Sequence, residues 1–128
     1  INISYKNDGK NRYLIYGIEN RIEQIIANLL DNAISFSDDN KDVIVQVSKS
    51  EDNKVYIKIL DEGQGFKEKD TNKIFKRFYS NRPDKFGQHS GLGLNIVKNL
   101  VDLHNATIKA TNRQDKKGAS MEIEFPKV

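Results

Sequence analysis

Two asparagines spaced for one face of a helix are the first residues that could do chemistry. In the stretch "ANLLDNAISFS", residues 27–37, Asn28 and Asn32 lie four positions apart. At the rotation of an α-helix, both amides and Ser35 fall within an arc of about 60°, opposite a stripe of isoleucines and leucines. An asparagine carbonyl oxygen can act as a hard ligand for Mg²⁺. The pattern predicts either a metal ligand facing a cleft or a pair of ordinary solvent-exposed amides.

A carboxylate followed by two glycines forms a second candidate, "DEGQGF" at residues 61–66. Asp61 could accept a hydrogen bond from an exocyclic amine. Gly63 and Gly65 would let a ligand approach the backbone where a Cβ would block it. The same residue types are also typical of a plain turn at the end of a strand.

A second glycine pair occurs in "SGLGLNIV", where Gly91 and Gly93 precede a helical pattern. The first N–H groups of a helix are unpaired, and the helix dipole favours an anion there. A simple helix entry would use similar residues, so this stretch is compatible with a phosphate site or with a turn.

The elements that must position these residues follow from hydrophobic periodicity. Apolar spacing of three and four predicts helices over 19–37 and over 92–105. Alternation predicts hairpins over 43–59 and over 106–126, whereas 80–90 has no period and contains Pro and Gly, which predicts a loop. These elements indicate a two-layer α/β sandwich with helices on one side of a largely antiparallel sheet.

Composition narrows the class of protein. A length of 128 residues predicts one domain, and the first residue, Ile1, leads us to expect a fragment of a longer chain. No apolar run approaches the roughly 18 residues that cross a bilayer. The chain has no cysteine, so disulfides and thiolate metal sites are excluded.

Positive charge is concentrated in one segment. The formal net charge is +3, yet residues 67–85 alone contain seven Lys or Arg against three acidic residues, a local charge of +4. Such a segment suits a small polyanion, and a solvated loop is the plain alternative. With this low net charge and no recognition motif, nucleic-acid binding is not expected.

The order of these stretches resembles the ATP-binding catalytic domain of sensor histidine kinases. The series runs from N-x-x-x-N through D-x-G-x-G and the paired aromatics of "IFKRFYS" to G-L-G-L at a helix start. It covers essentially the whole chain, and "NLLDNA" and "GLGLNIVKNLVDLH" resemble histidine kinases more than other members of the superfamily. The resemblance implies the Bergerat ATP-binding fold, with about five strands and about three helices.

The resemblance assigns roles to matching positions. It implies that Asn32 binds Mg²⁺, with Asn28 nearby, that Phe36 packs on adenine, and that Asp61 accepts from the adenine amine. Gly63 and Gly65 would then lie against the base. Phe75 and Phe78 would anchor a lid over 80–90, and Arg77 or Arg82 would reach the terminal phosphate. The polyphosphate would be wrapped by the second glycine motif, comprising His89, Ser90, Gly91, Leu92, Gly93 and Leu94.

Three positions depart from the family pattern. Ser35 occupies a position where many members have a basic residue that contacts phosphate, so that contact would be absent or supplied by the lid. His89 replaces a glycine that often begins the second glycine motif. Asn105 and Ala106 replace a Gly-Gly pair after the second helix, at a turn that Asn tolerates well.

The resemblance also separates kinases from hydrolases. Hydrolases of the superfamily carry a glutamate one helical turn before the metal-binding asparagine, and this chain has Asn28 there. An amide is a poor general base, so transfer of the γ-phosphoryl group to an external nucleophile is favoured over hydrolysis. The alternatives are a serine-directed kinase of the same superfamily and a degenerate nucleotide- or protein-binding module.

The acceptor and the partners are expected outside this chain. Neither His89 nor His104 resembles the family's phosphoacceptor sequence, so we expect the acceptor histidine on a dimerisation hairpin that precedes this domain. The implied partners are this hairpin in a homodimer and a cognate response regulator. The implied location is the cytoplasmic side of a sensor anchored in the bacterial inner membrane, with no membrane contact from this segment.

Overall fold

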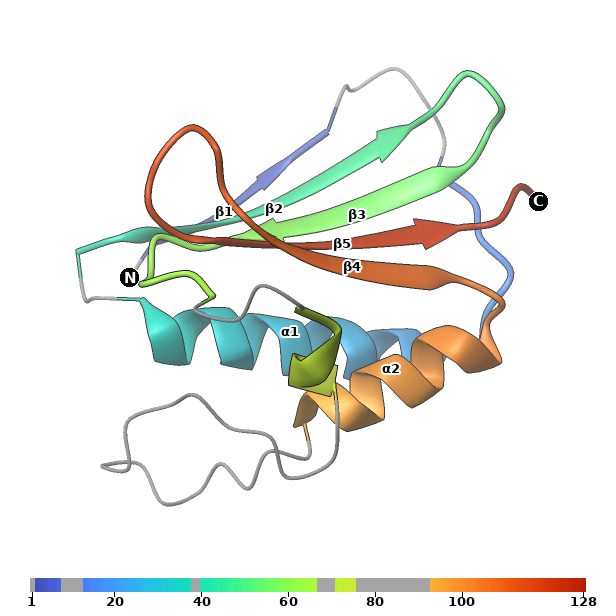
Figure 1. Cartoon of the computed structure of the whole chain (residues 1–128). Helices are drawn as coiled ribbons and strands as arrows, with labels where there is room; N and C mark the ends of the chain where they lie inside the picture. The colour runs from blue at the N-terminus through green and yellow to red at the C-terminus, as the bar shows by residue number, and fades with distance from the viewer. Residues whose placement is uncertain (1, 8–12, 38–39, 67–70, 76–92) are drawn as a thin grey trace.

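A computed structural model describes residues 2–7, 13–37, 40–66, 71–75 and 93–128 (Figure 1). Its centre is a five-stranded sheet in the order β1-β2-β3-β5-β4. The strands are β1 (Asn2–Lys6), β2 (Asp42–Lys49), β3 (Val55–Leu60), β4 (Thr107–Asn112) and β5 (Ala119–Phe125). Only the β1–β2 pair is parallel among the described strands. The expected mixed, largely antiparallel sheet is confirmed.

Both predicted hairpins are present. In the first, β2 pairs with β3, with Val45 opposite Ile59. In the second, β4 pairs with β5 and places Ile108 opposite Ile123. The strand β1 was not predicted, because five residues at the sheet edge give too short an alternation to stand out.

The helices lie on one face of the sheet, as expected (Figure 1). They are α1 (Glu19–Phe36), a short 3-10 helix η1 (Thr71–Phe75) and α2 (Gly93–Leu103). In the described residues there are thus two α-helices rather than about three, since the third helical segment is a single tight turn. Helices α1 and α2 pack against each other and run in opposite directions.

The core lies between the helices and the inner face of the sheet. The helices contribute Ile25 and Leu29 from α1 and Val97 and Val101 from α2. The central strands contribute inward-facing side chains at every second position: Val55, the half-buried Ile57 and Ile59 in β3, and Met121, Ile123 and Phe125 in β5. Each fully buried Leu, Ile or Phe side chain stabilises the fold by about 1.5–3 kcal/mol. No helix in the described residues is long and apolar enough to cross a membrane.

The end of α2 is fixed by a turn and by a buried imidazole. Asn105 adopts a left-handed backbone with φ of 56°, and the N–H of Ala106 donates to the carbonyl of Val101 at 3.1 Å. This arrangement closes the helix as a Schellman-type cap, which confirms that Asn serves at this turn. The ring of His104 bonds the Leu100 carbonyl through Nδ1 at 2.7 Å and accepts from the Ile18 N–H through Nε2 at 3.1 Å. His104 therefore ties the last turn of α2 to the first turn of α1.

Candidate functional site

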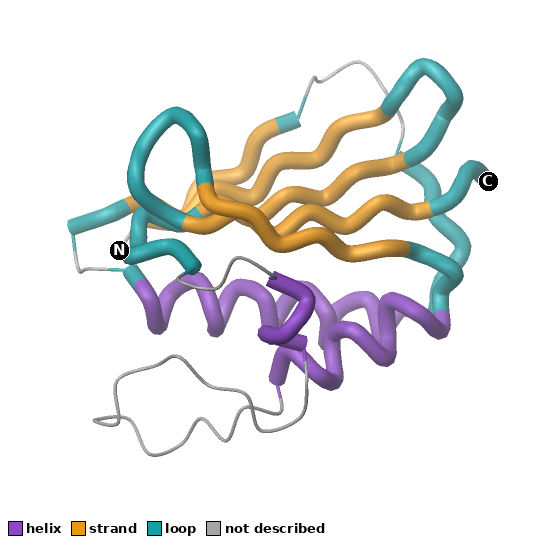
Figure 2. Tube along the Cα trace, in the orientation of Figure 1, coloured by secondary structure: helices purple, strands orange, loops and turns teal. Residues whose placement is uncertain are grey.

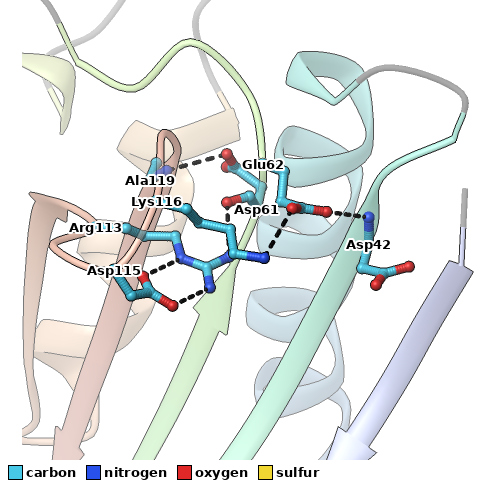
Figure 3. Close-up of polar contacts among 7 residues, drawn as sticks. All are labelled: Asp42, Asp61, Glu62, Arg113, Asp115, Lys116 and Ala119. Atoms are coloured by element: carbon cyan, nitrogen blue, oxygen red, sulfur yellow. Dashed lines mark hydrogen bonds and ion pairs between the residues drawn. The ribbon is translucent and has the colours of Figure 1, made fainter.

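Asp61 lies directly after β3, at the end of the sheet where β4 also ends and β5 begins. Its side chain is buried, with 4% exposed. Oδ1 accepts from the N–H groups of Gly63 at 2.8 Å and Ala119 at 3.1 Å (Figure 3). Both hydrogen bonds that the described residues make to this carboxylate end on Oδ1. Among the described residues, Oδ2 therefore has no hydrogen-bond partner, and it could accept a hydrogen bond from a ligand.

Burial is the main influence on the acidity of Asp61. Removal from water raises the pKa of this carboxyl above its ordinary value of 3.8. The two N–H donors and the positive charge of Arg113 act in the opposite direction. Asp61 thus combines an available acceptor oxygen with a costly buried charge, a combination that is frequent at functional sites.

The glycines after Asp61 are required by protein contacts. A Cβ on Gly63 would lie 2.5 Å from the carbonyl oxygen of Phe36, at the end of α1. Gly65 has a positive φ of 77°, and a Cβ there would lie 2.6 Å from Oδ1 of Asn112. The turn interpretation therefore accounts for both residues, and a role for them in admitting a ligand stays a prediction.

The β4–β5 hairpin supplies residues that the sequence did not single out. Arg113 donates from Nη1 to the carbonyl oxygen of Asp61 at 3.1 Å, and its guanidinium is held by Asp115 through Nε at 3.0 Å and Nη2 at 2.8 Å. The side chain of Arg113 is only 5% exposed. Asn112 accepts from the Phe66 N–H at 2.6 Å and donates to the Phe66 carbonyl at 3.2 Å. The β4–β5 hairpin thus holds the loop after β3 at its start, Asp61, and at its end, Phe66. Figure 2 shows the loop after β3 beside the loop that joins β4 to β5.

Nothing in "TNRQDKKG" separates these side chains from an ordinary polar hairpin turn. The one available signal is an arginine two residues before an aspartate, and that spacing is common on protein surfaces. The hydrogen bonds from Arg113 also lower the pKa of Asp115 to about 2.

A second ion pair lies beside Asp61 but does not contact its carboxylate. Glu62 accepts from the N–H of Asp42 at 2.8 Å and from Lys116 at 3.1 Å (Figure 3). The N–H of Asp42 and then the Lys116 hydrogen bond lower the pKa of Glu62. Glu62 therefore ties the start of β2 to the β4–β5 hairpin.

The last turns of α1 carry the other predicted residues. Asn32 is buried, with 5% exposed, so the solvent-exposed interpretation is wrong for this amide. Asn28, Ser35 and Phe36 are half-buried. The hydroxyl of Ser35 donates to the Asn32 carbonyl at 2.9 Å, which satisfies it within the helix. The contact between Phe36 and Gly63 places this end of α1 beside the loop that follows Asp61.

Around the predicted lid, the structure describes the flanking residues only. Phe75 is buried in η1, and its carbonyl accepts from the side chain of Asn95 in α2 at 3.2 Å. Leu94 packs against the core, whereas a Cβ on Gly93 would meet no described atom within 4 Å. Seven predicted site residues lie outside the described residues: Arg77, Phe78, Arg82, His89, Ser90, Gly91 and Leu92.

The described residues offer few side-chain ligands for a divalent cation. Among them, no group of three or more His, Asp or Glu side chains could hold a metal ion. Mg²⁺ bound together with a nucleotide needs only one or two side-chain oxygens, since phosphates and waters supply the rest. The amide of Asn32 fits that requirement.

The model of the family described as histidine kinase-, DNA gyrase B-, and HSP90-like ATPase matches residues 17–128. The chain belongs to this family. The resemblance noted from the order of the motifs is therefore confirmed, and so is the nucleotide-binding class to which it pointed.

Several sensor proteins are similar to the chain in sequence. The sensor protein ChvG of Agrobacterium fabrum is 37% identical over 116 residues, which are 88% of this chain and 19% of ChvG. The sensor histidine kinase WalK of Bacillus subtilis is 33% identical over 112 residues, which are 84% of this chain and 18% of WalK. The chain spans about a fifth of the length of these relatives.

Solved structures of this ATPase fold agree with the architecture. The mycobacterial sensor histidine kinase MprB superposes with a TM-score of 0.84 at 23% identity, over 98% of this chain and 80% of that chain. The catalytic domain of histidine kinase ThkA gives a TM-score of 0.81 at 25% identity, over 98% and 78% of the two chains. The two-layer fold is therefore that of histidine kinase catalytic domains.

Proposed function

We propose that this domain binds Mg-ATP and provides the γ-phosphoryl group for transfer to a histidine elsewhere in the same protein. The observation that carries the proposal is the carboxylate of Asp61, where Gly63 and Ala119 occupy Oδ1 and leave Oδ2 for a donor on a ligand. An adenine amine is such a donor. The sensor histidine kinases that this chain resembles support the choice of reaction.

Different elements would bind different parts of the nucleotide. Asp61 would recognise the base at the end of β3, and Phe36 at the end of α1 would pack against it. Asn32 would hold Mg²⁺, with Asn28 one turn earlier on the same helix. When bound, the cation would neutralise phosphate charge and orient the γ-phosphoryl group. Gly93 at the start of α2 would leave space for phosphate oxygens at a helix N-terminus.

The residue at position 28 favours a kinase over a hydrolase. An asparagine there cannot remove a proton from water at neutral pH, so the described part of α1 offers no general base one turn before Asn32. Phosphoryl transfer depends mainly on positioning and charge neutralisation, which these residues could provide. The nucleophile would come from a separate acceptor histidine.

We extend the proposal to the whole protein. The acceptor would lie on a dimerisation hairpin of a homodimer, and the phosphoryl group would pass to an aspartate of a response regulator. One structural neighbour, ThkA, was solved in complex with the response regulator protein TrrA. The domain would act on the cytoplasmic side of a sensor anchored in the inner membrane.

Substitution of Asp61 tests the recognition of the base. In Asp61→Asn, Oδ1 can still accept from Gly63 and Ala119, but an amide nitrogen replaces the available oxygen and meets the adenine amine donor to donor. Loss of one such bond costs about 1–3 kcal/mol, so ATP affinity should fall about tenfold or more. Isothermal titration calorimetry measures the affinity, and thermal unfolding checks the fold.

Glu62→Gln is the matched control, because it removes the same charge from the neighbouring residue. Its carboxylate contacts Asp42 and Lys116 rather than the proposed ligand position, so ATP affinity should be unchanged. Absence of ATP binding by the unaltered chain, or equal losses in both variants, would contradict the proposed function.

The position of the acceptor is tested with γ-labelled ATP. The isolated chain should take up no label, because neither of its two histidines resembles a phosphoacceptor. His104 in particular is buried and engaged through both ring nitrogens. Stable label on His104 or His89, detected by peptide mass spectrometry, would show that the acceptor has been placed wrongly.

A further inference from the structure

A buried arginine holds the main chain at Asp61. The guanidinium of Arg113 contacts the carbonyl oxygen of Asp61, and Asp115 fixes the other side of its fork through two hydrogen bonds. Its side chain is 5% exposed, although it lies in a hairpin loop that is otherwise largely exposed. These three hydrogen bonds together fix the position of the Arg113 side chain, because the guanidinium group is planar and its N–H donors have a fixed geometry.

The contact between Arg113 and Asp61 lies just after the end of β3, where the regular hydrogen bonds between strands stop. The N–H of Asp61 donates to the Ala119 carbonyl at 3.0 Å, which is the last main-chain bond that Asp61 makes to β5. A Cβ on Gly118 would lie 2.0 Å from the Asp61 carbonyl oxygen, and Gly118 itself accepts from the N–H of Arg113 at 2.9 Å. The oxygen that Arg113 binds is thus enclosed by the hairpin.

We propose that Arg113, oriented by Asp115, is a positioning residue of the nucleotide site. It holds the main chain of Asp61 so that the available carboxylate oxygen of Asp61 is presented to the base. This inference rests on the proposed function for the identity of the ligand. Arg113 touches neither the reacting atoms nor the base, and acts through Asp61.

Electrostatics supports the geometry. Burial raises the pKa of Asp61, and the charge of Arg113 opposes that rise. Among the described residues, the charged groups around the pair are Glu62, Asp115 and Lys116, and Lys116 is paired with Glu62. From α1, the described contact with this loop is the uncharged carbonyl of Phe36. Because the pKa of Asp115 is lowered to about 2, Asp115 keeps its hold on the guanidinium while Asp61 titrates.

The experiment follows the Asp61 carboxyl carbon by NMR as a function of pH, together with ATP affinity at neutral pH. The variants are Arg113→Gln, which keeps a donor and removes the charge, and Arg113→Lys, which keeps the charge and removes the fork. In Arg113→Gln the Asp61 titration midpoint should move to higher pH, and ATP affinity should fall about three- to tenfold. In Arg113→Lys the midpoint should stay close to that of the unaltered protein while affinity still falls.

Lys116→Met is the matched control. It removes the same charge from the same hairpin, but its ion pair is with Glu62 and its side chain is 51% exposed. Neither the Asp61 midpoint nor ATP affinity should change. An unmoved midpoint in Arg113→Gln, or an equal movement in Lys116→Met, would overturn the proposal.

Two further observations keep the test decisive. In the unaltered protein, the guanidinium signals of Arg113 should shift with the Asp61 midpoint, and their failure to do so would count against the proposal even if a variant did not fold. Absence of ATP binding combined with a midpoint that moves only in Arg113→Gln would overturn the proposed function and support the hold of Arg113 on Asp61.

Discussion

The carboxylate of Asp61 is costly to the fold. Its pKa in the folded chain is raised above the ordinary value of 3.8, so the folded state binds this proton more tightly than the unfolded state does. As the pH rises through the folded pKa, the carboxylate ionises and the free energy of unfolding falls. At neutral pH, Asp61 therefore lowers stability, which is consistent with a residue kept for binding.

Gly63 and Gly93 differ in the space that a side chain would have at each position. Gly63 has no room for a side chain because the Phe36 carbonyl occupies the position of a Cβ. Gly93 has open space at that position among the described residues. The first is explained by folding and the second is not, which makes Gly93 the more informative residue for function.

Alanine substitutions test this distinction. Gly63→Ala should lower the free energy of unfolding by about 1–3 kcal/mol, because the new methyl group overpacks against main chain. Gly93→Ala should leave stability unchanged or raise it by up to about 1 kcal/mol, since alanine is the better helix former. Urea denaturation measures both, and a large loss of stability in Gly93→Ala would show that the glycine is structural.

At the scale of elements, His104 adds a hydrogen-bonded link between the two packed α-helices. The backbone N–H of Ile18 donates to its Nε2, and Ile18, the cap residue of α1, has no side-chain cap of its own. The imidazole thus satisfies one of the N–H groups that a helix start leaves unpaired. Its other nitrogen bonds the Leu100 carbonyl near the end of α2.

Replacement of His104 should therefore destabilise the helix pair. His104→Ala leaves the Ile18 N–H without this acceptor and opens a space in a site that is 8% exposed. The free energy of unfolding should fall by about 1–3 kcal/mol. Leu103→Ala, at a neighbouring position that is 59% exposed, is the control and should cost about 0.5 kcal/mol or less. Equal losses in urea denaturation would contradict the linking role.

At the scale of the whole molecule, periodicity predicted the elements whose pattern is long and regular. The helix over 19–37 and both hairpins were predicted because each has several apolar positions in phase. The parallel strand β1 was not, since its pairing with β2 joins segments about 40 residues apart and leaves no local signal. The described residues contain two α-helices rather than about three, because the third helical segment, η1, is a single 3-10 turn.

The candidate site was predicted only in part. Asp61, Asn32 and the glycines stand out because their residue types and order resemble a known family. Arg113, Asp115 and Asn112 could not be found in this way, since their importance depends on a hairpin folding back onto the loop after β3. Sequence patterns indicate residues that touch a ligand more readily than residues that hold those residues in place.

The bond between Asp61 and Ala119 also bears on the order in which the domain becomes functional. The two residues are 58 positions apart, and a contact of such separation stabilises the chain only after a long loop has been closed. When synthesis has reached residue 112, both described α-helices and four of the five described strands are present in the chain, but Asp61 still lacks Ala119 and Arg113. The base-recognition site would therefore be completed only after Arg113 and Ala119 have been synthesised, more than fifty residues after Asp61 itself.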